Sequence, residues 1–239
     1  MPLTRKLGVE LIGTFFLVFT VGMATAAAGA LAPVAVGAVL MVMVFAGGHV
    51  SGGHYNPAVS IAVLLRRRLA ANEWAAYVVV QMLAALLAAA AVSVLGYAPK
   101  SPVAVAGDGK VLLAEFLFTF ALCYVVLSVA TTKATEGNSF YGLAIGFTVA
   151  AGGLAVGSVS GGAFNPAVAI GATVMGVFSW SHIWLYLVAN IAGGAAAAYA
   201  FLLTQPDDAR TGEHRPADRP SVLPRRADDD PPLRVGATQ

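Results

Sequence analysis

Long apolar runs alternate with short polar connections along most of the chain. Six runs reach the roughly 20 residues that a helix needs to cross a hydrocarbon core about 30 Å thick. They cover residues 7–28, 32–50, 74–95, 111–131, 140–158 and 182–204. The pattern therefore predicts an all-α membrane protein with six transmembrane helices, and an even number of spans puts both termini on the same side of the membrane.

Two shorter apolar stretches, 57–65 and 166–177, lie between the long runs. About ten residues of helix extend roughly 15 Å, which is half the thickness of the hydrocarbon core. Each stretch follows an asparagine, Asn56 or Asn165, and begins with proline. Asparagine is a strong N-cap, and proline suits the first helical position because its missing N–H has no partner there. The sequence therefore predicts two half-helices that enter the membrane without crossing it.

A nine-residue repeat surrounds the starts of these half-helices. The segment Ser-Gly-Gly-His-Tyr-Asn-Pro-Ala-Val at 51–59 recurs as Ser-Gly-Gly-Ala-Phe-Asn-Pro-Ala-Val at 160–168, and seven of the nine residues are identical. Glu10 in the first long run likewise has a counterpart in Glu115 of the fourth, and Thr-Phe follows each at the same spacing. The two halves of the chain therefore carry the same elements in the same order.

Each half, 5–96 and 110–204, holds three spans and one half-helix. An odd number of spans inverts one half relative to the other, so the half-helices enter from opposite faces of the membrane. Their N-termini, each equivalent to roughly +0.5 of an elementary charge, then face each other near the midplane and repel cations. Asn56 and Asn165 are therefore predicted to line a pore for uncharged molecules.

Irregular backbone precedes each half-helix. At this depth it is stable only where it lines a water-filled cavity, and glycine lets it approach a solute closely. The sequence therefore predicts a ladder of pore-facing carbonyl groups. The ladder comprises Gly52, Gly53 and His54 in the first half and Gly161, Gly162 and Ala163 in the second. The two Asn-Pro-Ala motifs are completed by Pro57, Ala58, Pro166 and Ala167.

Composition supports a protein embedded in lipid. Hydrophobic residues make up 58% of the 239, charged residues 11%, and the mean hydropathy is +0.78, which is too apolar for a soluble domain of this length. The net charge of +2 and the scattered arginines exclude a nucleic-acid-binding surface. The membrane lipid itself is the expected surrounding.

The distribution of basic residues predicts the orientation. One side of the predicted topology receives Arg5, Lys6, the triplet at 66–68 and Lys133, whereas the other side receives Lys100 and Lys110. The positive-inside rule makes the first side cytoplasmic, so both termini are expected in the cytoplasm and the chain in the plasma or inner membrane. Residues 205–239 are rich in Pro, Arg and Asp without apolar periodicity, and they are expected to form a disordered cytoplasmic tail.

Few residues offer other chemistry. Glu10 and Glu115 lie inside spans, where they serve either as anchors or as a proton relay. The absence of Lys or Arg inside any span favours the anchors. A metal site at His49 and His54 lacks a second cluster of ligands, and no catalytic constellation is present, so we expect no metal, no cofactor and no enzyme activity. Cys123, the single cysteine, lies in an apolar run and is expected to be a packed bystander.

At the paired Asn-Pro-Ala motifs the chain resembles the aquaporin and aquaglyceroporin family over about residues 5–204. The resemblance implies a channel domain at 1–204 with six transmembrane helices and two re-entrant half-helices in an inverted repeat. It also implies a tetramer of independent pores. In each pore, Asn56 and Asn165 would donate N–H groups to the passing molecule, and Glu10 and Glu115 would accept backbone hydrogen bonds from the half-helix loops.

The resemblance also predicts a selectivity filter near the outer mouth. Its four positions are Val36, Gly153, Gly162 and Val168. Most family members carry arginine at the last position, and strict water channels carry phenylalanine at the first and histidine at the second. Losing the arginine removes a bulky, fixed positive charge and leaves a wide apolar mouth. Certain plant vacuolar members also carry valine there, so a permissive pore for water, glycerol, urea, ammonia or hydrogen peroxide is expected.

The sequence is also compatible with two other functions. Inverted repeats with broken helices also build ion-coupled secondary transporters, although no coupling site is evident in the sequence. A poorly permeable structural membrane protein of the same fold is the third interpretation. Flux that is independent of proton and sodium gradients distinguishes a channel from a transporter, and measurable flux of any kind argues against the structural protein.

Overall fold

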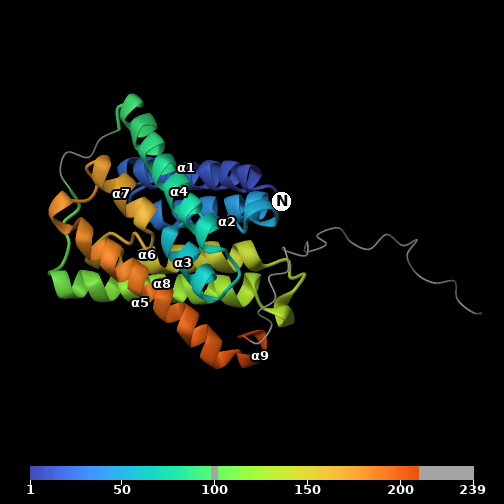
Figure 1. The fold of residues 1–239 in the computed structure, drawn as a ribbon. Coiled ribbons are helices and arrows are strands. Elements are labelled where there is room, and N and C mark those ends of the chain that lie inside the picture. Colours follow the sequence, from blue (N-terminus) through green and yellow to red (C-terminus); the bar gives the residue numbers. More distant parts are fainter. Residues whose placement is uncertain (98–101, 210–239) are drawn as a thin grey trace, which may run out of the picture.

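Helices account for all the regular structure that the computed structural model describes, which covers residues 1–97 and 102–209. Six of these helices are long and apolar enough to cross a membrane, as predicted (Figure 1). They are α1 Leu3–Ala27, α2 Ala32–Ser51, α4 Ala71–Val94, α5 Asp108–Ala130, α6 Tyr141–Ser160 and α8 Ile183–Thr204. Lys100 and residues 210–239 of the predicted tail lie outside the described residues.

Two nine-residue helices, α3 Pro57–Leu65 and α7 Pro166–Val174, occupy the places of the predicted half-helices. The first has the predicted bounds, whereas α7 ends before residue 177. Gly176 has φ of 80°, a left-handed conformation that terminates the helix, and Arg67 with φ of 62° follows α3 in the same way. The prediction of a longer second half-helix was wrong because apolarity continues past this turn.

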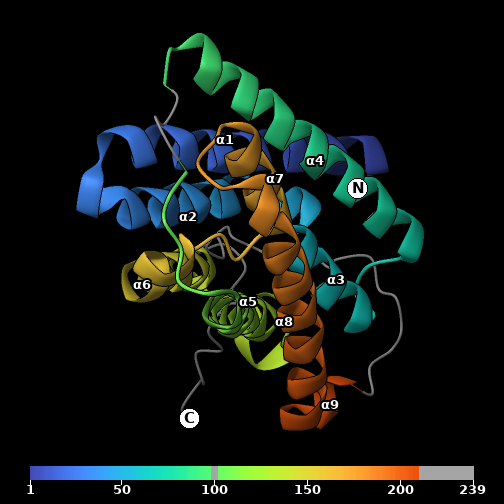
Figure 2. The same ribbon diagram turned by 90° about the vertical axis from the view of Figure 1, so that its left-hand side faces the viewer.

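The half-helices lie at the centre of the molecule. Figure 2 shows α3 and α7 between one group formed by α1, α2 and α4 and a second group formed by α5, α6 and α8. Each half-helix packs mainly against spans of the opposite half, because α3 contacts α8 and α5 while α7 contacts α4 and α1. The two halves of the chain are therefore interlocked around the centre.

The two groups also meet where α2 crosses α6. Gly37 and Gly146 face each other there, and a Cβ atom added to Gly146 would lie 2.6 Å from the Cβ of Met41. Such close approach needs small residues, as in other membrane helix pairs. Gly142, one turn before Gly146 on α6, instead faces the ring of Phe45.

A short helix, α9 Pro206–Ala209, follows α8 and covers the end of α3. The guanidinium of Arg66 lies 4.9 Å above the ring of Phe201 and 3.9 Å from the carboxylate of Asp208. Burial and the nearby Arg68 lower the pKa of Arg66, while Asp208 raises it. Figure 1 shows α9 at the same end of the bundle as the N-terminus.

Candidate functional site

The loops before the two half-helices share an unusual backbone. Gly52 and Gly53 have φ of 93° and 62°, and Gly161 and Gly162 have φ of 86° and 71°. These left-handed values favour glycine, which explains the Gly-Gly pair in each repeat. The carbonyl groups of these glycines, and those of His54 and Ala163, receive no hydrogen bond from any residue that the structure describes. Of these residues Gly53, His54 and Ala163 line the adjoining cavity, whereas Gly52, Gly161 and Gly162 do not, so the expected ladder is only partly in its wall.

A buried carboxylate holds the first loop. One oxygen of Glu10 accepts hydrogen bonds from the hydroxyl of Ser51 at 2.7 Å and from the backbone N–H of His54 at 2.9 Å. Its other oxygen accepts from the backbone N–H of Tyr55 at 2.7 Å and from the side-chain amide of Gln81 at 2.9 Å. Three donors thus fix the loop to α1, and Gln81 of α4 supplies the fourth.

The second loop repeats this arrangement at Glu115. One carboxylate oxygen accepts from the hydroxyl of Ser160 at 2.7 Å and from the backbone N–H of Ala163 at 2.9 Å. The other accepts from the backbone N–H of Phe164 at 2.8 Å. Because each carboxylate is engaged by the loop that it supports, the geometry is that of an anchor, and no described Lys or Arg side chain is paired with either one.

The two asparagines join the half-helices at the centre. Each caps its own helix, because the side-chain oxygen of Asn56 accepts from Ala58 N–H and that of Asn165 from Ala167 N–H, both at 2.8 Å. Each also donates to the opposite loop: Asn56 Nδ2 to the carbonyl of Phe164, and Asn165 Nδ2 to the carbonyl of Tyr55, both at 2.9 Å. An amide nitrogen carries two hydrogens, so one donor on each asparagine remains.

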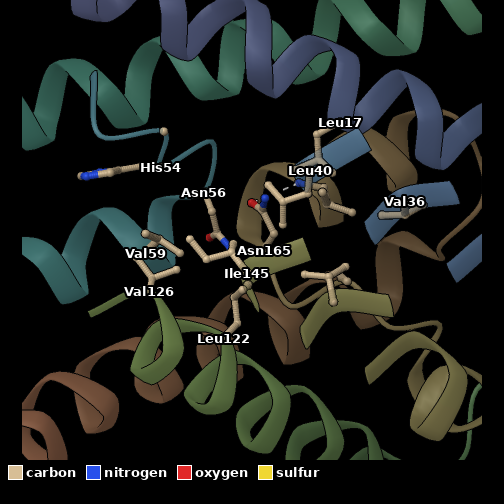
Figure 3. Close-up of a pocket in the computed structure, with 14 residues that line it drawn as sticks. Leu17, Val36, Leu40, His54, Asn56, Val59, Leu122, Val126, Ile145 and Asn165 are labelled. Carbon is tan, nitrogen blue, oxygen red and sulfur yellow. Dashed lines mark hydrogen bonds between the residues drawn. The ribbon is translucent and has the colours of Figure 1, made fainter. Parts of the chain in front are cut away.

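A narrow cavity lies beside these asparagines, as Figure 3 shows. Its volume of about 20 Å³ is just above the roughly 10–15 Å³ that a single water needs. The polar part of its wall comes from Asn56, Asn165 and the loops at Gly53, His54 and Ala163. The rest is aliphatic and consists of Leu17, Val36, Leu40, Val59, Leu122, Val126, Ile145, Val149 and Val168. One face of the cavity thus offers hydrogen bonds and the others offer none.

The structure divides the four expected filter residues into two pairs. Val36 and Val168 line the cavity. Gly162 lies against Gly153, because a Cβ atom added to Gly162 would be 3.4 Å from the Cα of Gly153. A Cβ atom on Gly153 would be 2.7 Å from the ring of Pro33, so this position faces α2. The cavity wall therefore includes the two valines but neither glycine.

Sequence reasoning missed several polar residues that complete the loops. The hydroxyl of Tyr77 donates to the carbonyl of Ser51 at 2.7 Å, and Tyr186 donates to Ser160 in the same way. In both pairs the tyrosine follows the serine by 26 residues. Extending the repeat beyond the nine-residue motif would have found this signal.

The two halves differ around the first loop. His54 Nδ1 lies 3.0 Å from the hydroxyl of Ser60, which also accepts from Gln81 at 3.2 Å. His49 is exposed whereas His54 is buried. Within 1–97 and 102–209, no three His, Cys, Asp or Glu side chains are grouped so that they could hold a metal ion. Of the polar residues in this group only His54 lines the cavity, and Ser60 and Gln81 lie behind it.

Comparisons with known proteins agree with this geometry. The model of the family described as "Major intrinsic protein" matches residues 2–201. Aquaporin NIP1-1 of Oryza sativa subsp. japonica is 35% identical over 213 residues, which cover 84% of this chain and 74% of the rice protein. Glycerol uptake facilitator protein-like 6 of Lactiplantibacillus plantarum is 36% identical over 217 residues, covering 85% of this chain and 100% of the bacterial protein.

A solved structure has the same fold. The X-ray structure of the aquaglyceroporin from Plasmodium falciparum matches with a TM-score of 0.76 at 20% sequence identity, and the match covers 87% of this chain and 99% of that one. Family, relatives and fold favour neither a transporter nor a structural protein. The chain belongs to the major intrinsic protein family and is a multi-pass membrane protein that forms a passive channel for water and small neutral solutes, not an enzyme.

Proposed function

We propose that solutes pass in single file between Asn56 and Asn165, each of which donates its remaining amide hydrogen to the passing molecule. The crosswise hydrogen bonds between the two loops are the observation that carries this proposal. They direct both half-helix N-termini toward one point, where the helix dipoles disfavour cations. Neutral molecules with hydrogen-bond acceptors are the solutes that this arrangement suits.

The apolar wall gives the pore its selectivity. Val36 and Val168 line the cavity and offer solutes no hydrogen bond, which supports an apolar filter without arginine. A valine-lined constriction disfavours a continuous water column, while solutes with an apolar flank fit it well. We infer that urea, ammonia, glycerol or hydrogen peroxide cross at rates comparable to water. The relative named a glycerol uptake facilitator supports this inference.

The proposal includes the assembly of the subunits and the orientation of the chain in the membrane. The exposed apolar helix faces are suited to lipid and to neighbouring subunits, and we propose a homotetramer of independent pores. The N-terminal end of α1, which carries Arg5 and Lys6, and the helix α9 lie at one end of the bundle (Figure 1). We assign this end to the cytoplasm by the positive-inside rule, and the membrane is then the plasma or inner membrane.

Light scattering of proteoliposomes in a stopped-flow instrument tests the function. Each solute is applied in turn, and the rates are compared with those of empty liposomes. We expect faster flux of water and of at least one larger neutral solute, with weak temperature dependence and no effect of proton or sodium gradients. Rates equal to those of empty liposomes, or flux that requires a gradient, would contradict the proposal.

A further inference from the structure

A second cavity lies away from the pore, among the ends of α1, α4 and α7. Its volume is about 190 Å³, and no residue of its wall belongs to the pore cavity. The wall consists of Gly22, Thr25, Ala26, Val92, Tyr97, Met175 and Val177. The C-terminal ends of α1 and α4 are opposite the N-terminus and α9, so the cavity lies in the half of the membrane that faces away from α9.

The cavity has an apolar floor and an open rim. Gly22, Val92, Met175 and Val177 are buried and form the floor, whereas Thr25, Ala26 and Tyr97 are exposed at the rim. The hydroxyl of Thr25 is occupied, since it donates to the carbonyl of Val21 at 2.7 Å. The hydroxyl of Tyr97 has no hydrogen-bond partner among the described residues. The site thus offers an apolar space with one available polar group at its entrance.

The inverted repeat explains why the space exists. Met175 caps the C-terminus of α7, and its counterpart Arg66 caps the C-terminus of α3. Val92 on α4 corresponds to Phe201 on α8, by the same spacing that relates Ser51 to Ser160. At the α3 end, Arg66 stacks on Phe201 and Asp208 lies beside it. At the α7 end, Met175 and Val92 stand in place of Arg66 and Phe201, and beside these smaller side chains lies the cavity.

The size and chemistry of the space define its occupant. An apolar cavity of about 150 Å³ stays dry and binds benzene. The present cavity has a comparable volume and an apolar floor, which favours an organic ligand over water. None of the wall residues in the described part of the chain is charged, which disfavours ions. We propose that this cavity binds a small uncharged lipophilic molecule, with an apolar body about the size of a benzene ring and a single polar group near Tyr97.

Photolabelling of the full-length protein tests the site. The probe is a hexanol derivative that carries a photoactivatable diazirine, and mass spectrometry locates the adducts. We expect labelling of the wall residues Tyr97 and Met175, and competition by excess unlabelled hexanol. At the α3 end the equivalent space is filled by Phe201. The substitution Val92→Phe introduces the same side chain into this cavity, and it should abolish labelling.

Val94→Phe is the matched control, because Val94 lies on the same helix but is 87% exposed and outside the cavity wall. Its labelling should equal that of the unmodified protein. If Val92→Phe does not fold, Met175→Phe fills the same space from α7. Undiminished labelling in a folded filling variant, or equal loss in Val94→Phe, would overturn the proposal. So would labelling that occurs in detergent but vanishes on reconstitution, since that result assigns the cavity to lipid acyl chains.

Discussion

At the scale of single residues, Tyr55 and Phe164 have a backbone conformation that side chains rarely permit. Their φ values are 49° and 51°, in the left-handed region that costs roughly 1–2 kcal/mol for a residue with a Cβ atom. The N–H group of each is held by a buried carboxylate, Glu10 or Glu115. The anchors thus impose a turn that aims the carbonyl groups of both residues at the opposite asparagine.

Glu115→Gln tests this role. An amide in place of the carboxylate turns one acceptor into a donor, which then faces the N–H of Phe164 or Ala163. Leaving a buried donor unsatisfied costs about 1–3 kcal/mol. We expect a lower melting temperature in detergent and loss of solute flux. Glu136→Gln, which changes an exposed carboxylate, should alter neither quantity, and an unchanged melting temperature in Glu115→Gln would argue against the anchor.

Val168 offers a second test at this scale. Arginine at this position adds bulk and a fixed charge to the narrow cavity wall, whereas Val168→Leu adds bulk alone. We expect Val168→Arg to reduce urea, glycerol and ammonia flux about tenfold or more, which corresponds to an added barrier of about 1.4 kcal/mol. Val168→Leu should have a smaller effect. Unchanged stopped-flow rates in Val168→Arg would count against the proposed filter.

Mercury sensitivity tests the environment of Cys123. This side chain is fully buried on α5, beside but not within the pore wall, and the residue three positions before Asn165 is Gly162 rather than cysteine. Mercuric ions therefore reach no thiol in the pore, and we expect little inhibition in a swelling assay. Strong inhibition that disappears in Cys123→Ser would show that α5 opens a path to this residue.

At the scale of elements, the Asn-Pro pairs predicted the starts of both half-helices. Local chemistry decides these positions, because an N-cap and a proline act within one turn. The end of α7 depends on the turn at Gly176, which apolarity alone does not reveal. α1 begins at Leu3, before the predicted residue 7, because polar residues prolong a helix beyond the hydrocarbon core.

The crossing of α2 and α6 yields a prediction about stability. In Gly146→Ala the added methyl group would meet Met41, and overpacking of this kind costs typically about 1–3 kcal/mol. We expect a lower melting temperature. Gly157→Ala on the same helix has no atom within 4 Å of the added Cβ, and helical alanine there should be neutral or slightly stabilising. Equal melting temperatures for the two variants would show that the crossing tolerates larger residues.

At the scale of the whole molecule, the repeat predicted the inversion but not the interlocking. Two copies of Ser-Gly-Gly and Asn-Pro-Ala were enough to infer opposed half-helices. That α3 packs on α8, and α7 on α4, depends on contacts between apolar faces that look alike in sequence. Apart from Val36 and Val168, the aliphatic pore wall was missed for the same reason, since Leu122 and Ile145 resemble any other span residues.

Separation of the halves tests the interlocking. A chain divided within the connection at 102–107 and expressed as two polypeptides should reassemble, since the contacts between α3 and α8 and between α4 and α7 are not covalent. We expect co-purification of the fragments and solute flux from the pair, but no flux from either fragment alone. Flux from a single fragment would contradict the interlocked arrangement.

The crosswise bonds of Asn56 and Asn165 also have a consequence for biosynthesis. While the ribosome is still making the second half, Asn56 has no partner carbonyl, because Phe164 has not yet been synthesised. Until then the first re-entrant segment is held only by bonds within the first half, such as those of its loop to Glu10. Joining of the two half-helices at Asn56 and Asn165 is thus a late step of biosynthesis. A partly formed pore therefore does not conduct solutes across the membrane while the chain is being made.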